Sequence, residues 1–499
     1  MTGREGSLFG RPFPRFKGEW SGPGLHSRMT RKTTQTGPVK DKEETLLEKV
    51  TPRTLSGFME LSPMRQAQFD RMLNSLRESY ALYGFTALDT PVIEAAEVLL
   101  AKGGGETEKQ IYRFQKGDND LALRFDLTVP LAKYVAARAG ELSFPFRRFQ
   151  IGKVYRGERA QRGRFREFYQ ADIDVIGDGT LDIMNEAEIP AVIYRSFTAL
   201  GLRNFRIRIN NRKVLNGFFS ILGVRERAAE VLRAVDKLEK IGADKLRVLL
   251  IDELGMDGET ADRLLAFISC SGSSADKLAF LEGWRGQEPL FDTGLDELRA
   301  VTEHMTGFGV PEENFELDLT IARGLDYYTG TVYETMLTEH PEIGSICSGG
   351  RYDNLAEFYT NRKLPGVGIS IGLTRLFYVL EEQGMLSDEC VTAPADALVI
   401  PLGDTLPAAI RTATVLRAAG VRTQLYFEPK KFKARLTYAS RLGIPYAVIV
   451  GEDEAANGTA AVKDLTTGVQ EVLTPEEAAK RMLEGLAVRA AVPPIRDEA

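Results

Sequence analysis

The hydrophobic positions at the start of the patterned part of the chain recur at helical spacing. From Ser62 onward, apolar side chains follow at intervals of three and four residues: Met64, Phe69, Met72, Leu73, Leu76 and Tyr80. Such spacing lines one face of a helix, and Pro63 suits a first helical turn. Gly84 ends the pattern, and residues 85–94 are typical of a strand that Pro91 confines to an edge or a bulge. The sequence therefore predicts a helix followed by an edge strand.

Strand patterns lie on both sides of a helical block. Further strands are expected at 121–127, 146–156, 165–177, 205–210, 315–321, 328–338 and 366–372. Several are joined by short turns, which favours an antiparallel sheet over alternating βα units. Between about 218 and 312 the pattern becomes helical, with helices expected over 226–241, 243–254, 259–268 and 295–305. We interpret this block as a helical insertion between two strand-bearing halves.

Strands and helices alternate again after Cys390. Strands are expected over 397–402, 423–426, 446–450, 458–464 and 469–473, with helices over 406–419 and 432–442 and from Pro475. This alternation is typical of a separate α/β domain. The fold class is therefore α+β. The expected parts are a basic tail (1–48), a main domain with the helical insertion (49–390), the α/β domain (391–488) and a loose end (489–499).

Composition narrows the class of protein. The chain has 499 residues, of which 43% are hydrophobic and 27% charged, and its net charge is −6. These values are ordinary for a globular protein. Its three cysteines are far apart and it has three histidines, which excludes a disulfide framework and leaves little material for a metal site or a serine-hydrolase triad. No apolar run approaches the ~18 residues that span a bilayer. A reducing, cytoplasmic compartment fits best.

The first 40 residues are expected to be disordered. They are rich in Gly, Pro, Ser, Thr and Arg, without a sustained helical or strand period. Eight basic residues against Glu5 and Glu19 give the stretch a charge of +6. Two interpretations stay open: a transit peptide, which would be acid-poor and basic, or translation that starts at Met29.

Site chemistry is concentrated in residues 322–334, Ala-Arg-Gly-Leu-Asp-Tyr-Tyr-Thr-Gly-Thr-Val-Tyr-Glu. Arg323 carries a permanent charge that suits a carboxylate or a phosphate. Tyr327 and Tyr328 supply flat walls with polar tips. A polar turn with one solvated arginine would also explain these residues, because short motifs have many false positives. The segment therefore indicates an anion site that other segments must support.

A second segment, 145–177, is basic within an acidic protein: residues 145–170 hold eight basic and two acidic side chains. The pattern predicts a strand ending near Arg156, a basic loop at 157–164, and a return strand from Phe165. Alternation on the return strand places one set of side chains on a common face: Arg166, Phe168, Gln170, Asp172 and Asp174. This mixture favours a pocket floor over a core, and the alternative is a solvated basic hairpin.

The second segment resembles motif 2 of class II aminoacyl-tRNA synthetases, which is Arg-x-Glu, a loop, and a strand bearing arginine and phenylalanine. The resemblance implies that Arg156 contacts the α-phosphate of ATP and that Glu158 binds the adenine amine. Phe168 would stack on adenine, and Arg164 would join the ATP-binding set. The loop would approach the acceptor end of a tRNA through Arg159, Gln161 and Arg162.

Residues 365–376, Pro-Gly-Val-Gly-Ile-Ser-Ile-Gly-Leu-Thr-Arg-Leu, predict a glycine-spaced strand that runs into a helix. Glycines let a ligand approach the backbone, and Arg375 in the first helical turn can meet a terminal phosphate. A packed glycine-rich strand is the ordinary explanation of such a segment by itself. The segment resembles class II motif 3, whose arginine binds the γ-phosphate.

Three stretches resemble histidyl-tRNA synthetases in particular. Residues 322–334 resemble their first histidine-specific signature, and Ser-Gly-Gly-Arg-Tyr-Asp at 348–353 resembles the second. Leu-Arg-Phe-Asp-Leu-Thr-Val-Pro at 123–130 resembles their amino-acid-binding strand. The resemblance covers about 50–485 and implies a class II catalytic domain with a C-terminal anticodon-binding domain. It implies a homodimer that uses ATP with Mg²⁺, L-histidine and tRNA(His), without a membrane or DNA partner.

The same resemblance assigns the remaining site residues. Arg156 and Arg323 would be catalytic, and no protein-held metal is expected. The histidine-binding set would be Asp126, Thr128, Gln170, Asp174, Arg323, Tyr327 and Tyr328. Many histidyl enzymes have Glu where this chain has Asp126 and Asp174. These shorter acids, and Arg-Phe-Arg-Glu-Phe-Tyr-Gln at 164–170, resemble the eukaryote-like branch of the family.

Two other functions stay open. A non-catalytic synthetase paralogue that regulates histidine biosynthesis would share the catalytic fold. Such proteins tend to lack the anticodon domain and to erode the Arg-Gly-Leu-Asp-Tyr-Tyr segment, and both are intact in this sequence. A general single-strand RNA-binding protein has only the basic loop in its favour.

Overall fold

The structure is a computed structural model that describes residues 50–101, 106–159, 161–321, 327–387, 393–490 and 493–495. The basic tail with Met29, residues 322–326 with Arg323, and Cys390 lie outside these ranges. Among the described residues, no helix combines the length and apolar character needed to cross a membrane.

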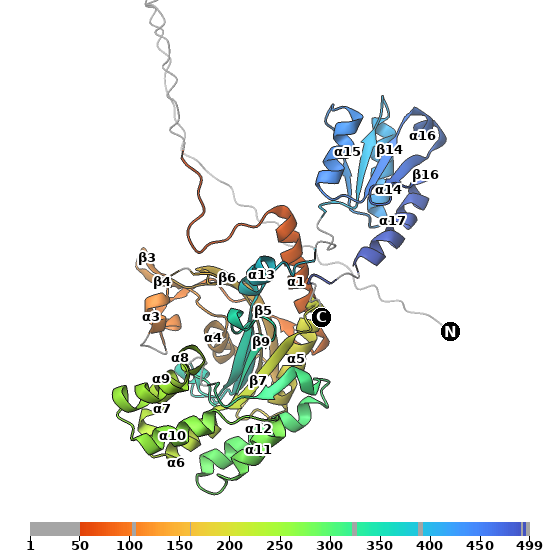
Figure 1. Ribbon diagram of the computed structural model, residues 1–499. Coiled ribbons are helices and arrows are strands. Elements are labelled where there is room, and N and C mark those ends of the chain that lie inside the picture. The colour runs from red at the N-terminus through yellow and green to blue at the C-terminus, as the bar shows by residue number, and fades with distance from the viewer. Residues whose placement is uncertain are drawn as a thin grey trace, which may run out of the picture. The chain divides into compact units, whose positions relative to one another are not determined.

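The largest sheet has eight strands in the order β1-β5-β6-β11-β10-β9-β7-β8, and the largest hydrophobic cluster packs against it. Figure 1 shows strands β5, β7 and β9 of this sheet with helices around them. Its strands are β1 (Thr86–Ala87), β5 (Phe146–Tyr155), β6 (Glu167–Ile176), β7 (Phe205–Asn211), β8 (Phe315–Leu317), β9 (Thr331–Leu337), β10 (Cys347–Tyr352) and β11 (Gly366–Gly372). The β1–β5 and β7–β8 pairs are parallel, and the other neighbours are antiparallel. The expected mostly antiparallel sheet is confirmed.

Strand β6 separates the core from the candidate site. Its residues Ala171, Ile173 and Val175 are fully buried in the core cluster. That cluster also contains apolar side chains of α1 (Pro63–Leu82), α5 (Met184–Leu200) and α13 (Leu373–Glu382). The alternate β6 residues line a cavity, and three of these four are polar: Phe168, Gln170, Asp172 and Asp174. The period of two thus gives one strand two different faces.

The strand expected over 85–94 is interrupted. It divides into β1 and β2 (Ile93–Ala95), with Pro91 in the gap. Proline has no backbone N–H to donate to a neighbouring strand, so pairing stops there. Strand β2 pairs with β4 (Asn119–Leu123), which pairs with β3 (Arg113–Lys116) in a three-stranded sheet. The short helices beside it are α2 (Ala96–Leu99), α3 (Glu106–Gln110) and α4 (Thr128–Arg138).

Helices fill the interval between β7 and β8, as the sequence predicts (Figure 1). They are α6 (Arg212–Ile221), α7 (Ala228–Val235), α8 (Leu238–Ile241), α9 (Ala243–Val248), α10 (Gly258–Ile268), α11 (Ser274–Glu282) and α12 (Pro289–Met305). The first helix begins at Arg212, ahead of the expected start near 218. A Cβ on Gly217 would lie 2.5 Å from Phe291 N, and one on Gly294 would lie 2.6 Å from Val214 N. Glycine therefore allows α6 and α12 to touch through their backbones.

A separate five-stranded sheet follows Ala393, in the order β13-β12-β14-β15-β16. Its strands are β12 (Ala397–Pro401), β13 (Thr423–Leu425), β14 (Tyr446–Val450), β15 (Ala460–Asp464) and β16 (Gln470–Leu473). Its helices are α14 (Leu406–Ala418), α15 (Phe432–Arg441), α16 (Glu452–Asn457) and α17 (Pro475–Ala490). Val399 packs with residues of α14 and α17, whereas its neighbour Leu398 packs with α15. The predicted α/β pattern is present, and only α16 was not expected.

The expectation of a loose end at 489–499 is wrong for the residues that are described. Helix α17 continues to Ala490, and Ile495 forms an isolated bridge with Leu386. The Ile495 N–H donates to Leu200 O at 3.0 Å, and the side chain is 1% exposed. A Cβ on Gly201 would collide with Ile495 O. The segment is held because burial of an isoleucine side chain stabilises it by about 1.5–3 kcal/mol.

Candidate active site

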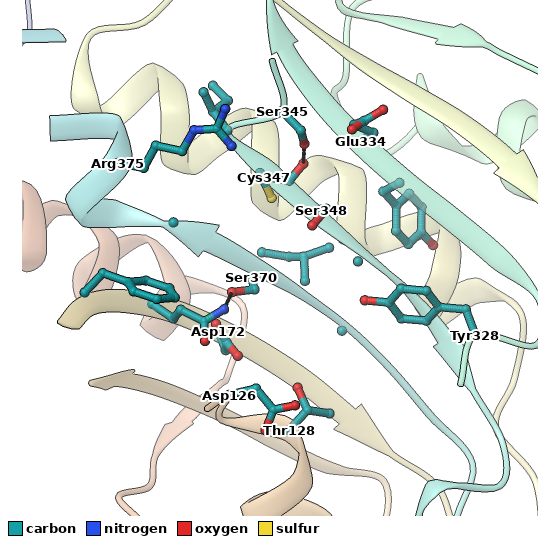
Figure 2. Close-up of a pocket in the computed structure, with 18 of the residues that line it drawn as sticks. Asp126, Thr128, Asp172, Tyr328, Glu334, Ser345, Cys347, Ser348, Ser370 and Arg375 are labelled. Atoms are coloured by element: carbon teal, nitrogen blue, oxygen red, sulfur yellow. Dashed lines mark hydrogen bonds between the residues drawn. The ribbon is translucent and has the colours of Figure 1, made fainter. Parts of the chain in front are cut away.

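A cavity of about 580 Å³ lies over the polar face of β6. It brings together the following residues that the sequence predicts for ATP and histidine: Asp126, Thr128, Arg156, Glu158, Arg164, Phe168, Gln170, Asp174, Tyr327, Tyr328 and Arg375. Figure 2 shows part of this lining, with side chains from different strands pointing into one space. Arg323 lies outside the described residues. The loop residues Arg159, Gln161 and Arg162 are exposed and do not line the cavity.

The hairpin of β5 and β6 places a cation over an aromatic ring. Arg156 directly follows β5, and its Nε donates to Phe125 O at 3.1 Å. Its guanidinium carbon lies 5.1 Å from the centre of the Phe168 ring. This pairing is a cation–π contact. The cavity therefore presents a fixed positive charge and a flat π surface side by side, which suits a phosphate next to a base.

The loop after β5 reaches the first turn of α13. Gly163 has a φ of +70°, and a Cβ there would lie 3.7 Å from Arg375 Cγ. Arg375 donates to Ile343 O. Arg164 pairs with Glu158 at 3.6 Å, and Arg162 pairs with Glu382 of α13 at 2.9 Å. The two arginine-bearing segments thus meet at one end of the cavity.

Arg166 does not share the face on which the sequence places it. Strand β6 begins at Glu167, so the alternation of the strand does not extend back to Arg166. The Arg166 Nε donates to Glu158 O at 3.1 Å, and Nη1 donates to Ser56 O at 3.4 Å. The prediction for Arg166 is wrong because it was extrapolated beyond the end of the strand. The side chain instead supports the backbone of the loop.

The floor of the cavity is a cluster of carboxyl groups. Asp126, Asp172 and Asp174 are each 2% exposed. Burial raises the pKa of Asp126 and of Asp174 to about 6 and that of Asp172 to about 7. The Val129 N–H donates to Asp126 Oδ1 at 3.1 Å, which fixes this carboxyl at the start of α4.

A fully buried arginine lies among these acids. Arg148 of β5 is 0% exposed, and its Nη2 lies 2.7 Å from Asp174 Oδ2. The same nitrogen donates to Leu127 O at 3.0 Å. On the opposite side of the acid, the Tyr352 hydroxyl donates to Asp174 Oδ1 at 2.6 Å. Asp174 is therefore held by a cation and a hydroxyl from two different strands.

Tyrosines form the wall beside the acids. The Tyr327 and Tyr328 rings lie 5.0 Å apart at 71°, and the Tyr327 and Tyr352 rings lie 5.8 Å apart at 78°. Burial raises the pKa of Tyr328, so its hydroxyl is neutral at ordinary pH. Figure 2 shows this hydroxyl pointing across the cavity toward the side that carries Asp126 and Asp172. The wall thus combines an apolar ring surface with a polar tip.

Residues 348–353, which resemble the second histidine-specific signature, hold the part of residues 322–334 that follows Tyr328. The Arg351 guanidinium donates to Glu186 Oε1 at 2.6 Å and to Asp353 Oδ1 at 2.9 Å. The Thr329 hydroxyl donates to Asp353 Oδ2 at 2.6 Å, and Thr329 N–H donates to Arg351 O at 2.8 Å. The side chain of Glu186 is 0% exposed. This network anchors the backbone directly after Tyr327 and Tyr328.

Sequence reasoning missed several residues of the site. Arg148 and Tyr352 hold Asp174, and the Ser370 hydroxyl accepts a hydrogen bond from Gln170 Nε2 at 2.7 Å (Figure 2). Glu334 also lines the cavity. Arg148 and Tyr352 lie inside segments that the sequence had singled out, but nothing in the linear pattern says which acid they meet.

Comparisons with known proteins identify the family to which this chain is similar. The family model described as histidyl-tRNA synthetase matches residues 57–376, and that of the anticodon binding domain matches 396–485. The histidine–tRNA ligase of Clostridium tetani is 54% identical over 431 residues, which are 86% of this chain and 98% of that protein. The histidine–tRNA ligase of Xanthomonas axonopodis pv. citri is 50% identical over 459 residues, or 87% of this chain and 96% of that protein.

A solved structure of the same family has a similar fold. The crystal structure of histidyl-tRNA synthetase from Nostoc sp. PCC 7120 has a TM-score of 0.81 and 39% identity. The match covers 88% of this chain and 100% of the Nostoc chain. With family models that match both parts of the sequence and relatives at about half identity over most of their length, the chain belongs to the histidyl-tRNA synthetase family.

Proposed function

We propose that this chain is a histidine–tRNA ligase, which joins L-histidine to ATP as histidyl-adenylate and then transfers histidine to tRNA(His). The overall products are histidyl-tRNA, AMP and diphosphate. One observation carries the proposal: a single cavity joins the acids Asp126 and Asp174 and the hydroxyl of Tyr328 to the cations Arg156 and Arg375. A site for an amino acid with a basic ring is thereby continuous with a site for a triphosphate.

The first step is an in-line displacement at phosphorus. A carboxylate oxygen of histidine attacks the α-phosphorus of ATP, the bond to the bridging oxygen breaks, and diphosphate leaves with that electron pair. Negative charge is then spread over the α-phosphate oxygens, so positioned cations stabilise the transition state. Arg156 supplies one such cation from the end of β5. Arg323 supplies the second in our proposal.

The ATP-binding half of the cavity is built around Phe168, on which adenine would stack, and Glu158 would accept a hydrogen bond from the adenine amine. Arg164 and Arg375 would meet the phosphates. Mg²⁺ would accompany ATP and neutralise part of the phosphate charge. Mg²⁺ prefers oxygen ligands, and the phosphate oxygens of ATP would supply them, because the described residues form no cluster of three or more His, Cys, Asp or Glu side chains that could hold a metal ion.

The histidine-binding half of the cavity has polar side chains both for the α-ammonium group and for the imidazole ring. Asp126, Thr128 and Gln170 would hold the α-ammonium group, and Asp174 and Tyr328 would contact the imidazole, with Tyr327 packed behind. A site built to pair N–H groups rejects apolar analogues strongly, by a factor of roughly 10⁴, because its own polar groups would be left unpaired. Selection of histidine then needs no second, editing site.

The second step belongs to the tRNA. The 3′-terminal ribose hydroxyl attacks the carbonyl carbon of the adenylate, and AMP leaves with the bridging oxygen. The acceptor end would be met by the exposed loop residues Arg159, Gln161 and Arg162. Mobile cations of this kind suit an RNA backbone. The proposed catalytic domain spans 49–390 and the proposed anticodon-binding domain 391–488, in a cytoplasmic homodimer.

Histidine-dependent exchange of labelled diphosphate into ATP tests the first step. We expect exchange with L-histidine and none without an amino acid or with L-phenylalanine, and we expect histidine to be attached to a tRNA(His) transcript. A regulatory paralogue or a general RNA-binding protein would give no exchange. A folded protein that bound ATP but failed to exchange diphosphate would refute the ligase proposal.

A further inference from the structure

The buried acids of the cavity outnumber the buried cation beside them. Asp126, Asp172 and Asp174 are each 2% exposed, and Arg148 is 0% exposed. Arg148 lies 2.7 Å from Asp174 and lowers the pKa of Asp172 and Asp174, although burial raises both by more. With every carboxyl ionised, this group of four side chains carries a net charge of −2. Burial of uncompensated charge is costly, so a ligand that enters must bring positive charge.

Asp172 is the one of these three acids to which the proposed function assigns no group of the substrates. From its own strand it faces Asp174, from the start of α4 it faces Asp126, and from β5 it faces Arg148. The other titratable groups around it are Tyr80 of α1, Cys347 of β10 and Tyr328, and burial raises the pKa of all three. These three groups are therefore neutral at ordinary pH and cannot balance its charge.

Three acceptor atoms of this floor lack donors, although Asp172 also has a hydrogen bond with the Ser370 side chain. Asp172 Oδ1, Asp126 Oδ2 and Gln170 Oε1 are buried and have no hydrogen-bond partner among the described residues. All three side chains line the cavity (Figure 2 labels the two aspartates). An unpaired buried acceptor costs about 1–3 kcal/mol, so such atoms indicate a ligand that donates N–H groups.

We infer that the pocket binds histidine with its ring protonated, as the imidazolium, and that Asp172 is the carboxylate that this second positive charge balances. The inference rests on the proposed function. The α-ammonium group and the imidazolium together bring +2, which cancels the −2 of the four side chains. The histidine carboxylate lies toward Arg156, which also faces Asp126. An imidazolium has two N–H donors, one for an aspartate and one for the Tyr328 oxygen.

The protonated ring of bound histidine contrasts with the ring of free histidine in solution. Its ring has a pKa near 6.5, so at pH 8 the free ring is almost entirely neutral. Burial raises the pKa of Asp172 to about 7, so at pH 8 this carboxyl is mostly ionised. Binding at pH 8 therefore takes up close to one proton from solution. Two competing arrangements take up none: a neutral ring beside an ionised Asp172, and an Asp172 whose charge is met by Arg148 alone.

Calorimetry of histidine binding at pH 8, repeated in buffers with different ionisation enthalpies, measures this proton. We expect close to one proton taken up per site by the natural protein and close to none by Asp172→Asn, which keeps the shape and removes the charge. We also expect the Kd of the natural protein to rise about tenfold more than that of the variant per pH unit above 7.5. Equal proton uptake by the two proteins would overturn the inference.

A second measurement does not depend on the variant. Histidine labelled with ¹⁵N in the ring, bound to the natural protein at pH 8, should show two protonated ring nitrogens in its NMR spectrum. One protonated and one bare nitrogen would refute imidazolium binding even if Asp172→Asn failed to fold. Failure of the ligase proposal would look different, because histidine would then give no saturable binding and no diphosphate exchange.

Discussion

Replacing Tyr352 with phenylalanine removes one oxygen atom from the histidine-reading half of the pocket. The Tyr352 hydroxyl donates to Asp174 Oδ1 at 2.6 Å, and the residue is 3% exposed. A hydrogen bond to a charged group contributes about 1.5–3 kcal/mol. If Asp174 reads the imidazole, losing this bond should lower kcat/KM for histidine by roughly 10- to 150-fold, since each 1.36 kcal/mol is about tenfold. The KM for ATP should change little.

Diphosphate exchange separates these two effects when histidine is varied at saturating ATP and ATP at saturating histidine. Tyr359→Phe is a matched control, because its hydroxyl donates to the backbone oxygen of Val98 at 2.8 Å and the residue does not line the cavity. The control should leave both kinetic constants unchanged. An unchanged kcat/KM for histidine in Tyr352→Phe, or an equal loss for both substrates, would refute the role given to Asp174.

Four further changes test other parts of the site. Arg323→Ala should abolish adenylate formation in single-turnover assays while ATP binding stays measurable by calorimetry, and near-normal turnover would refute its catalytic role. Phe168→Ala should raise the KM for ATP by about 5- to 150-fold, because stacking of a base contributes about 1–3 kcal/mol. Arg351→Met leaves Glu186, whose side chain is 0% exposed, without its cation, and should cost about 3–5 kcal/mol in urea unfolding. Burial raises the pKa of Asp172 to about 7, so the folded state holds a proton that the unfolded state releases. This contribution to stability is present at low pH and lost as pH rises through 7. Between pH 6 and 8 the natural protein should therefore lose about 1.4 kcal/mol more stability than Asp172→Asn.

The sequence predicted those parts of the site whose geometry depends on local periodicity. Alternation along β6 placed Phe168, Gln170 and Asp174 on one face, and the structure puts all three in the cavity. The same rule failed at Arg166, which precedes the first residue of β6 and contacts the backbone oxygens of Glu158 and Ser56 instead of lining the cavity. The helix–strand order of the C-terminal domain followed from its hydrophobic pattern in the same way.

The sequence did not predict which side chains from distant segments contact each other. Arg351 meets Glu186 across 165 positions, and Tyr352 meets Asp174 across 178. Such pairs depend on the register of β6, β11 and β10, which a one-residue slip would reverse. The burial of Ile495 was missed for a related reason, because one isoleucine between two prolines and a charged stretch shows no period.

The bridge between Leu386 and Ile495 has a consequence for the evolution of the chain. The Ser387 N–H donates to Pro494 O at 3.0 Å, so residues before and after the segment that contains the five-stranded sheet lie side by side. A module whose two ends are neighbours can be gained, lost or exchanged without rethreading its host, because only one short join has to be remade. The residues that flank the anticodon-binding match at 396–485 are therefore neighbours in space, an arrangement that suits the gain or loss of a whole module.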